Sequence, residues 1–148
     1  MASVLKGTLV LPDGVRVRPR GLGRPAPDGP DPEFGLYLGS RRMRRTYGPD
    51  LWWEQEWVWW PDFLLPVDRR EARRQILGLH ERAAAGAAVE VACYGGVGRT
   101  GTVLACLATL GGMRAEEAVE WVRETHDRRA VETPWQRRWV RWFAGQPG

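Results

Sequence analysis

Cysteine and histidine are both scarce in this sequence of 148 residues, which contains two of each. Cys93 and Cys106 show no paired spacing, and no histidine pair accompanies them, so the ligand pattern of a zinc site is absent. Isolated cysteines are typical of proteins that stay reduced inside the cell. The sequence therefore predicts no metal site and a cytoplasmic protein.

Long apolar segments are missing as well. The longest apolar stretch, around residues 102–110, is far shorter than the roughly 20 residues that a membrane-spanning helix needs. The N-terminus has no charged start followed by an apolar run, which is the pattern of an export signal. The sequence thus predicts neither membrane insertion nor export, and no membrane partner.

Lysine is nearly absent, since Lys6 is the only one among 22 basic residues. Arginine therefore supplies most of the positive charge behind the net charge of +4, and arginine binds oxyanions such as phosphate bidentately. The one dense basic cluster, in residues 41–45, has only Tyr47 as an aromatic neighbour. Nucleic-acid binding is therefore disfavoured, and a solvated basic face is the simplest interpretation of the cluster.

The remaining composition is typical of a folded globular protein, with 43% hydrophobic and 27% charged residues. A chain of this length can bury one core. We therefore expect a single domain over residues 1–148, in which residues 1–33 form a hairpin and a loop rich in proline and glycine. Residues 34–148 then form the core that carries the function.

The pattern of apolar residues predicts strands that alternate with helices. Two β-rich runs, Val4–Leu11 and Val15–Arg20, flank a Pro-Asp-Gly turn and are interpreted as an N-terminal hairpin. Three further strands are predicted at Phe34–Leu38, Glu56–Trp60 and Ala88–Ala92. The last of these is apolar apart from Glu90, which favours a central position in a sheet. The basic segment that precedes Glu56–Trp60 is expected to be irregular.

Helical spacing of apolar residues predicts four helices, which cover about Val67–Ala85, Thr100–Leu110, Arg114–Thr125 and Pro134–Phe143. Asp68 is a suitable N-cap for the first helix, and Gly86 is a suitable end. Strands separated by helices favour an α/β fold. We therefore expect a central, mostly parallel sheet flanked by helices, with the β-hairpin at the N-terminus.

Aromatic and histidine residues near these elements are given structural roles. The tryptophans and the tyrosine of residues 47–57 could wall a deep substrate pocket, but burial in the core is the simpler expectation. His80 and His126 are expected to be surface residues rather than ligands.

The most informative segment is a glycine-rich loop between a predicted strand and a predicted helix. Such a turn points backbone N–H groups inward and adds the positive end of the helix dipole, which together bind an oxyanion. A cysteine at its mouth is favoured as a nucleophilic thiolate, and an arginine at its end can hold two phosphate oxygens. The alternative is a small buried cysteine beside a tightly packed turn. The loop reads Cys93-Tyr94-Gly95-Gly96-Val97-Gly98-Arg99-Thr100-Gly101.

This loop resembles the signature loop of the protein tyrosine phosphatase superfamily, in which a cysteine and an arginine bracket five residues and a serine or threonine follows. It looks closest to the compact, dual-specificity-like members. The segment Trp60-Pro61-Asp62-Phe63, followed by Pro66, is similar to the mobile acid loop (WPD loop) of the family and lies at the expected spacing from Cys93. Residues 131–136 resemble the segment that positions the hydrolytic water.

The resemblance implies a role for each matching residue. Cys93 would attack phosphorus and form a phosphocysteine, and Asp62 would protonate the leaving oxygen and later activate water. Thr100 would donate to the thiolate, and Gln136, with Glu132, would help to place the water. No metal or other cofactor is implied. The phosphate oxygens would be bound by the backbone of Tyr94, Gly95, Gly96, Val97, Gly98 and Arg99, with the Arg99 side chain.

Three positions depart from the pattern of the family. Ala92 stands where a histidine usually helps to order the loop, Leu64 replaces a common glycine of the acid loop, and Glu132 replaces a glutamine. A carboxylate near a phosphorylated intermediate should repel it. These departures leave the reactivity of Cys93 open.

The implied substrate is phosphotyrosine or a dual-specificity protein substrate. One alternative is a phosphatase for a small phosphorylated metabolite, nucleotide or lipid, since the short chain leaves little room for peptide-recognition loops. Another is a pseudophosphatase that binds phosphate with little turnover. A sulfur-transfer enzyme is disfavoured, because sulfur transfer needs no acid at Asp62.

Overall fold

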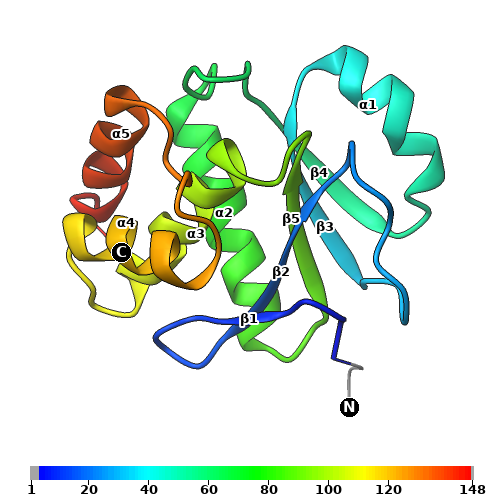
Figure 1. Cartoon of the computed structure of the whole chain (residues 1–148), viewed down its shortest axis with the longest axis horizontal. Helices are drawn as coiled ribbons and strands as arrows, with labels where there is room; N and C mark the ends of the chain where they lie inside the picture. Colours follow the sequence, from blue (N-terminus) through cyan, green and yellow to red (C-terminus); the bar gives the residue numbers. More distant parts are fainter. Residues whose placement is uncertain (1–3, 148) are drawn as a thin grey trace.

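The protein contains one five-stranded sheet within residues 4–147, the residues described by this computed structural model (Figure 1). Its order across the sheet is β1-β2-β5-β3-β4, in which β2, β5, β3 and β4 run parallel and β1 pairs antiparallel with β2. The expected mostly parallel sheet with an N-terminal hairpin is confirmed. In chain order the strands are β1 (Leu9–Val10), β2 (Arg16–Gly21), β3 (Phe34–Gly39), β4 (Glu54–Trp59) and β5 (Val89–Cys93).

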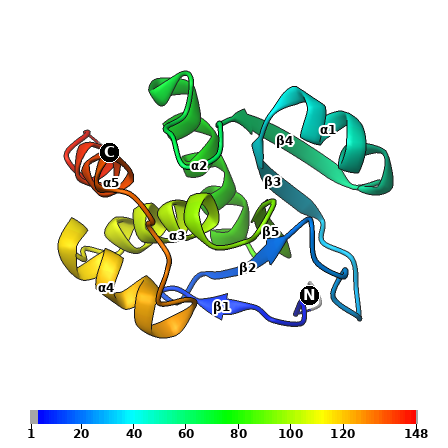
Figure 2. The same ribbon diagram turned by 45° about the horizontal axis from the view of Figure 1, so that its top comes forward.

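Helices α2 to α5 cover one side of the sheet, whereas α1 lies apart from them beside the β3 and β4 end (Figures 1 and 2). None of the helices within residues 4–147 combines the length and the apolar character needed to cross a membrane. The helices are α1 (Arg41–Tyr47), the short 3-10 helix η1 (Gly48–Asp50), α2 (Arg69–Ala84), α3 (Gly98–Leu110), α4 (Ala115–Thr125) and α5 (Pro134–Ala144).

Apolar side chains form two clusters, one on each face of the sheet. The larger cluster fills the space between the sheet and α2 to α5, so these helices and the sheet share one core. The smaller cluster lies on the opposite face, where loops and α1 rather than long helices provide the cover. Its buried members are Leu22, Tyr37, Leu51, Trp57 and Ala92.

The limits of α2 follow from local chemistry that the sequence already contains. The Asp68 carboxylate accepts hydrogen bonds from the backbone N–H groups of Arg70 and Glu71, both at 3.1 Å, so the predicted N-cap is confirmed. Gly86 follows the helix with φ of +99°, a left-handed conformation that glycine adopts without steric cost.

The sheet brings the expected site to one edge. β5 lies between β2 and β3, as its apolar sequence predicts, and Gly21 pairs with Cys93. The carboxyl ends of the parallel strands face the same edge, which is where open α/β sheets bind their ligands. The glycine-rich loop follows β5 at this edge, and the segment Trp60–Pro66 follows β4 there.

The first arm of the hairpin is shorter than the sequence predicts. Only Leu9–Val10 pairs with β2, although the prediction covered Val4–Leu11. The Thr8 backbone N–H donates to the Leu5 carbonyl at 3.3 Å, and the Thr8 hydroxyl bonds the same oxygen. This turn satisfies groups that a longer strand would have paired.

The basic segment after β3 is helical rather than irregular. The Ser40 side chain caps α1 by accepting a hydrogen bond from the Met43 N–H at 3.1 Å. No residue of α1 is buried, so the segment lacks the apolar periodicity by which the sequence reveals a helix. Arginine nevertheless has a high helix propensity, which supports this short exposed helix.

The first residues of β4 and α3 also differ from the prediction by two positions. β4 covers Glu54–Trp59 rather than Glu56–Trp60, because its parallel pairing with β3 begins at Phe34 opposite Glu54. α3 begins at Gly98 rather than Thr100, and the Gly101 N–H donates to the Val97 carbonyl at 2.8 Å. The first turn of α3 is therefore part of the glycine-rich loop.

Candidate active site

Cys93 is the last residue of β5, and its side chain is buried with 2% of its surface exposed. Its Sγ accepts a hydrogen bond from the Gly96 N–H at 3.2 Å and from the Thr100 hydroxyl at 3.1 Å. The Thr100 Oγ1 also accepts from the Cys93 N–H at 2.9 Å. One donor thus comes from the glycine-rich loop and one from the first turn of α3, and both are directed at the sulfur.

The loop after Cys93 packs closely against the end of β2. Gly96 has φ of +75°, and a Cβ built there would lie 2.8 Å from the Gly21 backbone nitrogen and 2.9 Å from the Arg20 carbonyl carbon. A side chain at this position would therefore displace the backbone. Glycine is required at 96 both for the conformation and for the close approach.

His126, the C-cap residue of α4, holds the same loop from the other side. Its Nε2 lies 2.7 Å from the Gly96 carbonyl oxygen, and because a carbonyl only accepts, Nε2 carries the hydrogen. The ring is half-buried against the loop, so His126 makes a structural contact that the sequence did not predict. No local motif marks this contact, which joins residues far apart in sequence.

Arg99 connects the loop to the segment Trp60–Pro66. Its side chain is 5% exposed, its Nη1 donates to the Trp60 carbonyl at 2.9 Å, and its Nη2 lies 3.5 Å from Asp62 Oδ1. Its Nε is buried and has no hydrogen-bond partner among the described residues. Cys93, Arg99 and Asp62 are thus brought to one place from two separate segments of the chain.

The Asp62 side chain is 58% exposed, and its Oδ1 also accepts a hydrogen bond from the Phe63 N–H at 3.0 Å. Phe63 adopts φ of +60°, a left-handed conformation that is unusual for a bulky residue. The backbone bend of this segment therefore falls at Phe63, and Leu64, which replaces the glycine of the family pattern, keeps a negative φ.

Donors from α5 and from Trp60 hold the carbonyl groups of the Trp60–Pro66 segment. The Phe63 carbonyl accepts from the Trp135 indole N–H at 2.5 Å. The Leu64 carbonyl accepts from the Trp60 indole N–H at 2.8 Å and from the Gln136 amide at 3.4 Å. The start of α5 is therefore tied to the segment that carries Asp62.

Gln136 is fully buried, and both ends of its amide are engaged. Its Oε1 accepts from the backbone N–H groups of Glu132 at 2.9 Å and Thr133 at 3.3 Å, as part of the capping box of α5. Its Nε2 makes the contact with Leu64. In this arrangement the amide faces backbone groups, so its expected role in placing water stays a prediction.

Glu132 lies against the first turn of α3, because a Cβ built on Gly98 would overlap its carboxylate oxygen. Partial desolvation there raises the pKa of Glu132, and the nearby Asp62 carboxylate raises it further. Arg123 fixes this segment by donating to the carbonyl oxygens of Ala130 and Val131, both at 2.9 Å. The carboxylate is thus held beside the loop that begins at Cys93.

Metal ligands are not clustered in this region. Within residues 4–147, no group of three or more histidine, cysteine, aspartate and glutamate side chains is placed to hold a metal ion. What the site offers instead is a sulfur surrounded by donors, a buried guanidinium and an adjacent carboxylate. These groups suit the binding and transfer of an oxyanion.

Residues 65–141 match the model of a protein family described as PTP-SAK, a Swiss Army Knife protein with a DSP-PTPase phosphatase domain. The matched segment covers a little over half of the chain. It includes Cys93, Arg99 and Gln136, whereas Asp62 lies just before it.

Two uncharacterized proteins of Methanocaldococcus jannaschii are similar to part of the chain. MJECL20 is 51% identical over 55 residues, which are 37% of this chain and 36% of that protein. MJ0215 is 50% identical over 52 residues, which are 35% of this chain and 31% of that protein. The chain thus matches only about a third of the length of either relative.

Solved structures of phosphatases share the fold. Tk-PTP in its active form superposes with a TM-score of 0.73 at 21% identity, covering 96% of this chain and 99% of that chain. A substituted form of kinase associated phosphatase gives 0.64 at 19% identity, covering 76% and 71%. PTPMT1 in complex with PI(5)P gives 0.63 at 17% identity, covering 76% of each chain. At these identities the likeness establishes the fold.

Proposed function

Because the chain belongs to the PTP-SAK family of dual-specificity-like phosphatases within the protein tyrosine phosphatase superfamily, we propose that it hydrolyses phosphate monoesters through a phosphocysteine at Cys93. The observation that carries this proposal is the arrangement of the three central groups. Cys93 Sγ accepts two hydrogen bonds, and Arg99 joins its loop to Asp62 across 3.5 Å.

In the first step, Cys93 Sγ attacks phosphorus, the S–P bond forms and the bond to the leaving oxygen breaks. Asp62 donates its proton to that oxygen, so the leaving group departs as a neutral alcohol or phenol. Arg99 Nε is unpartnered and Nη2 makes only the 3.5 Å contact with Asp62, so this edge of the guanidinium is open to two phosphate oxygens. Inward-facing backbone N–H groups of residues 94–99 bind the remaining charge.

In the second step, Asp62 takes a proton from water, the oxygen of that water attacks phosphorus, and the S–P bond breaks. The Cys93 thiolate leaves while the Thr100 hydroxyl, 3.1 Å from Sγ, donates to it. One carboxyl group thus acts first as acid and then as base. The proposed two-step reaction requires no metal or other cofactor. Both cysteines are free thiols, which fits a reducing, cytoplasmic setting.

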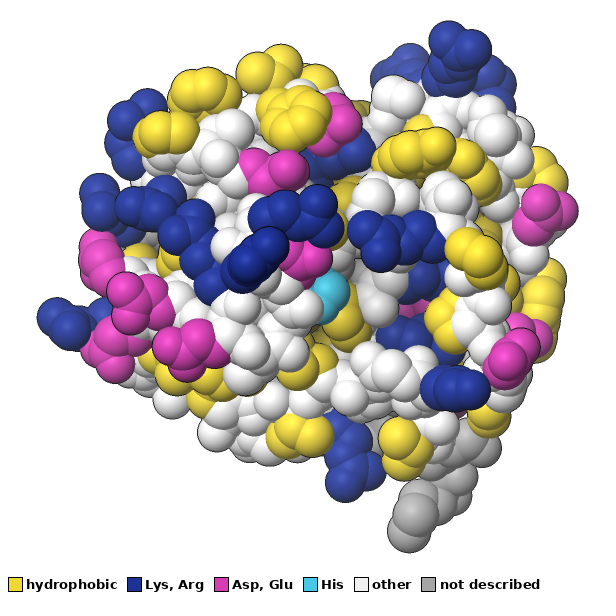
Figure 3. All heavy atoms as spheres, in the orientation of Figure 1, with side chains coloured by type: hydrophobic (Ala, Val, Ile, Leu, Met, Phe, Trp, Pro, Cys, Tyr) yellow, Lys and Arg dark blue, Asp and Glu magenta, His cyan; other side chains and the backbone are white. Residues whose placement is uncertain are grey.

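The proposed substrates are phosphotyrosine or dual-specificity protein substrates. A second candidate is a small, multiply charged phosphate ester such as a nucleotide or lipid headgroup, and the arginines of α1 favour it. Lys and Arg side chains gather over α1 (Figure 3), and Arg41 stacks on Trp59, next to the residue whose carbonyl holds Arg99. PTPMT1 itself was solved with PI(5)P. Measuring the binding of phosphopeptides and of small phosphate esters to the Cys93→Ser variant separates the two candidates.

Hydrolysis of p-nitrophenyl phosphate in the presence of EDTA tests the proposed activity. We expect steady turnover that chelation does not change, because every group that acts in the proposed reaction belongs to the chain. Binding of tungstate without any turnover would support the pseudophosphatase alternative instead. Activity that appears only after a divalent metal is added would contradict the proposal.

Replacing Glu132 by glutamine should strengthen phosphate binding severalfold at neutral pH. The substitution removes a carboxylate that lies beside the proposed phosphate-binding loop and repels an anion. The pKa of Glu132 is raised, so lowering the pH protonates this group and brings wild type toward the variant. The measurement is the ratio of phosphate inhibition constants, variant to wild type, across pH. A ratio that stays the same at every pH would show that Glu132 does not act through its charge.

Replacing His126 by alanine should slow both turnover and alkylation of Cys93 by about tenfold, because one hydrogen bond that fixes Gly96 is lost. His126→Asn should recover part of the loss, since its amide can also donate. The matched control is His80→Ala, because His80 contacts Asp13 far from the loop. Equal rates in His126→Ala and wild type would show that the contact does not position the loop.

A further inference from the structure

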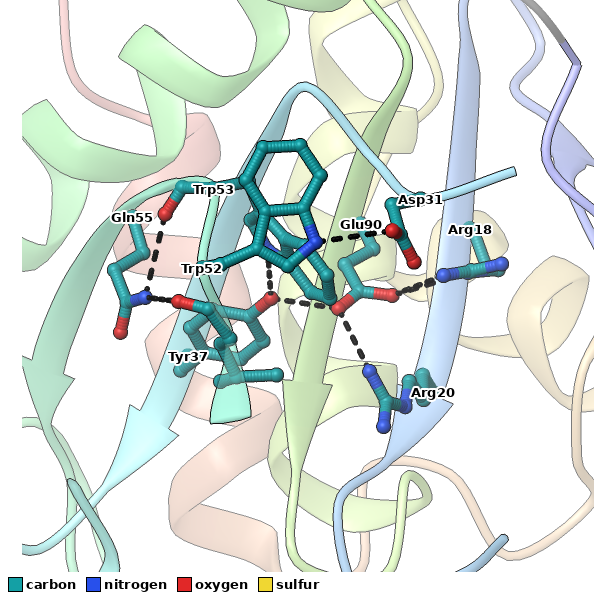
Figure 4. Close-up of polar contacts among 9 residues, drawn as sticks. Arg18, Arg20, Asp31, Tyr37, Trp52, Trp53, Gln55 and Glu90 are labelled. Atoms are coloured by element: carbon teal, nitrogen blue, oxygen red, sulfur yellow. Dashed lines mark hydrogen bonds and ion pairs between the residues drawn. The ribbon is translucent and has the colours of Figure 1, made fainter. Parts of the chain in front are cut away.

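A buried ionic cluster lies on the face of the sheet opposite α2 to α5 (Figure 4). Glu90 is fully buried in β5, and its Oε1 accepts from Arg18 Nε at 3.0 Å and Nη2 at 2.6 Å. Its Oε2 accepts from the Tyr37 hydroxyl at 2.6 Å and from Arg20 Nη1 at 3.1 Å. The carboxylate is therefore saturated by groups from β2 and β3.

The cluster carries more positive than negative charge. Two guanidinium groups share one carboxylate, and burial and the Glu90 charge both raise the pKa of Tyr37, which keeps the phenol neutral. Arg18 is 3% exposed, yet its Nη1 has no hydrogen-bond partner among the described residues, and the same holds for Arg20 Nε. A buried N–H donor without an acceptor is costly, and within the described residues two such donors and one positive charge of this cluster stay uncompensated.

A cavity of about 460 Å³ adjoins this cluster, a volume within the usual range for small-molecule sites. Arg18 and Arg20 line it together with Trp52 and Trp53. Trp53 is half-buried and donates to the Tyr37 hydroxyl at 2.7 Å. Trp52 is 74% exposed, so its predicted burial in the core is wrong. Indole rings beside guanidinium groups suit a planar ligand.

Two carboxylates complete the lining of the cavity. Asp31 and Asp50 are both exposed, and Asp31 accepts a hydrogen bond from the Trp52 indole at 3.0 Å. They are acceptors, whereas the arginines beside the buried cluster are donors. The cavity thus combines two guanidinium groups for an anion, aromatic walls for a ring and acceptors for hydrogen atoms on that ring.

We propose that this cavity binds a small anion joined to a planar ring that carries hydrogen-bond donors, the chemistry of a purine nucleotide. The site is separate from the catalytic loop, because Arg18 pairs in register with Glu90, three residues before Cys93 on β5. It also adjoins that loop, because the ring of its lining residue Tyr47 lies 6.4 Å from the ring of Tyr94.

Isothermal titration with adenosine 5′-monophosphate tests the site once the catalytic loop is blocked. Treatment with iodoacetate places a carboxylate on Cys93, whereas burial raises the pKa of the Cys106 thiol and protects it. We expect one molecule of the nucleotide to bind per chain. Adenosine alone and inorganic phosphate alone should each bind at least about tenfold more weakly, because each lacks one part of the recognition.

Two variants locate the binding. Arg20→Gln removes the excess charge while Arg18 still pairs with Glu90, and Trp52→Ala removes an exposed ring without opening the core. Each should weaken nucleotide binding by about tenfold. Arg138→Gln, a change at an exposed arginine on α5, should not. The Trp52 variant keeps the test valid even if Arg20→Gln folds poorly.

Three outcomes would overturn the proposal. The first is that the nucleotide does not bind to the blocked protein, even if it binds to the protein with an unmodified loop. The second is binding that neither Arg20→Gln nor Trp52→Ala weakens. The third is inorganic phosphate binding as tightly as the nucleotide, since the aromatic walls would then contribute nothing. None of these results depends on whether Cys93 is catalytic.

Discussion

Replacing Cys93 by serine is expected to reduce turnover by at least about 10⁴-fold, because the hydroxyl is a far weaker nucleophile than the thiolate it replaces. Phosphate binding should persist, since the Arg99 side chain and the backbone N–H groups of the loop remain. Steady-state hydrolysis of p-nitrophenyl phosphate measures the first effect, and calorimetric titration with tungstate measures the second.

The second cysteine provides the matched control for this experiment. Cys106 is fully buried within α3 and contacts the apolar core, so Cys106→Ala should leave kcat near that of wild type. Appreciable turnover in Cys93→Ser would show that another group attacks phosphorus. Loss of tungstate binding together with turnover would show that the substitution damages the loop rather than the chemistry.

Replacing Asp62 by asparagine is expected to lower kcat by about 10² to 10⁴-fold for phosphotyrosine, whose leaving group needs a proton. Asparagine preserves the size of the side chain and an oxygen that can accept from the Phe63 N–H, so the loop should keep its conformation. With p-nitrophenyl phosphate, the first step should be less affected, because p-nitrophenolate leaves without protonation. The second step should still be slow, since no base remains.

Asp28→Asn is the control for Asp62→Asn, because Asp28 is an exposed residue of the loop between β2 and β3. This control should leave kcat unchanged for both phosphotyrosine and p-nitrophenyl phosphate. An unchanged kcat in Asp62→Asn would remove Asp62 from the mechanism. An equal loss for both substrates in the first step would show that its role is not proton donation.

The sequence was sufficient to predict the central strand and the loop because both are local signals. The apolar run before Cys93 marks a buried strand, and the glycines that follow mark a turn into a helix. The Asp68 cap is likewise a local interaction. These features depend on residues a few positions apart, so periodicity and motif spacing can reveal them.

The contacts that hold the site could not be predicted in this way. His126 reaches Gly96, and Trp135 reaches the Phe63 carbonyl, only after the helices pack together. Neither contact has a local signature, because each joins residues that lie far apart in the sequence. The Ala92 position also has a tertiary explanation: its side chain is fully buried in the smaller apolar cluster, where an imidazole would overpack the site. His126 is therefore the better residue for testing how the loop is ordered.

The same limit applies to the ionic cluster. Glu90 stands out in the sequence as the single charge of a central strand, but its partner Arg18 lies 72 positions away. In a chain with so many arginines, composition cannot identify which of them is buried. Parallel pairing of β2 with β5 decides it, because Arg18 and Glu90 are opposite each other in register.

The most direct test of the proposed mechanism is to trap the phosphocysteine. The Asp62→Asn variant is mixed rapidly with p-nitrophenyl phosphate, quenched in denaturant within the first turnover and digested for mass spectrometry. The mechanism predicts a burst of p-nitrophenol and a phosphoryl group on the peptide at Cys93, with no such adduct in Cys93→Ala. A burst without phosphorylation of Cys93, or a phosphoryl group on another residue, would contradict it.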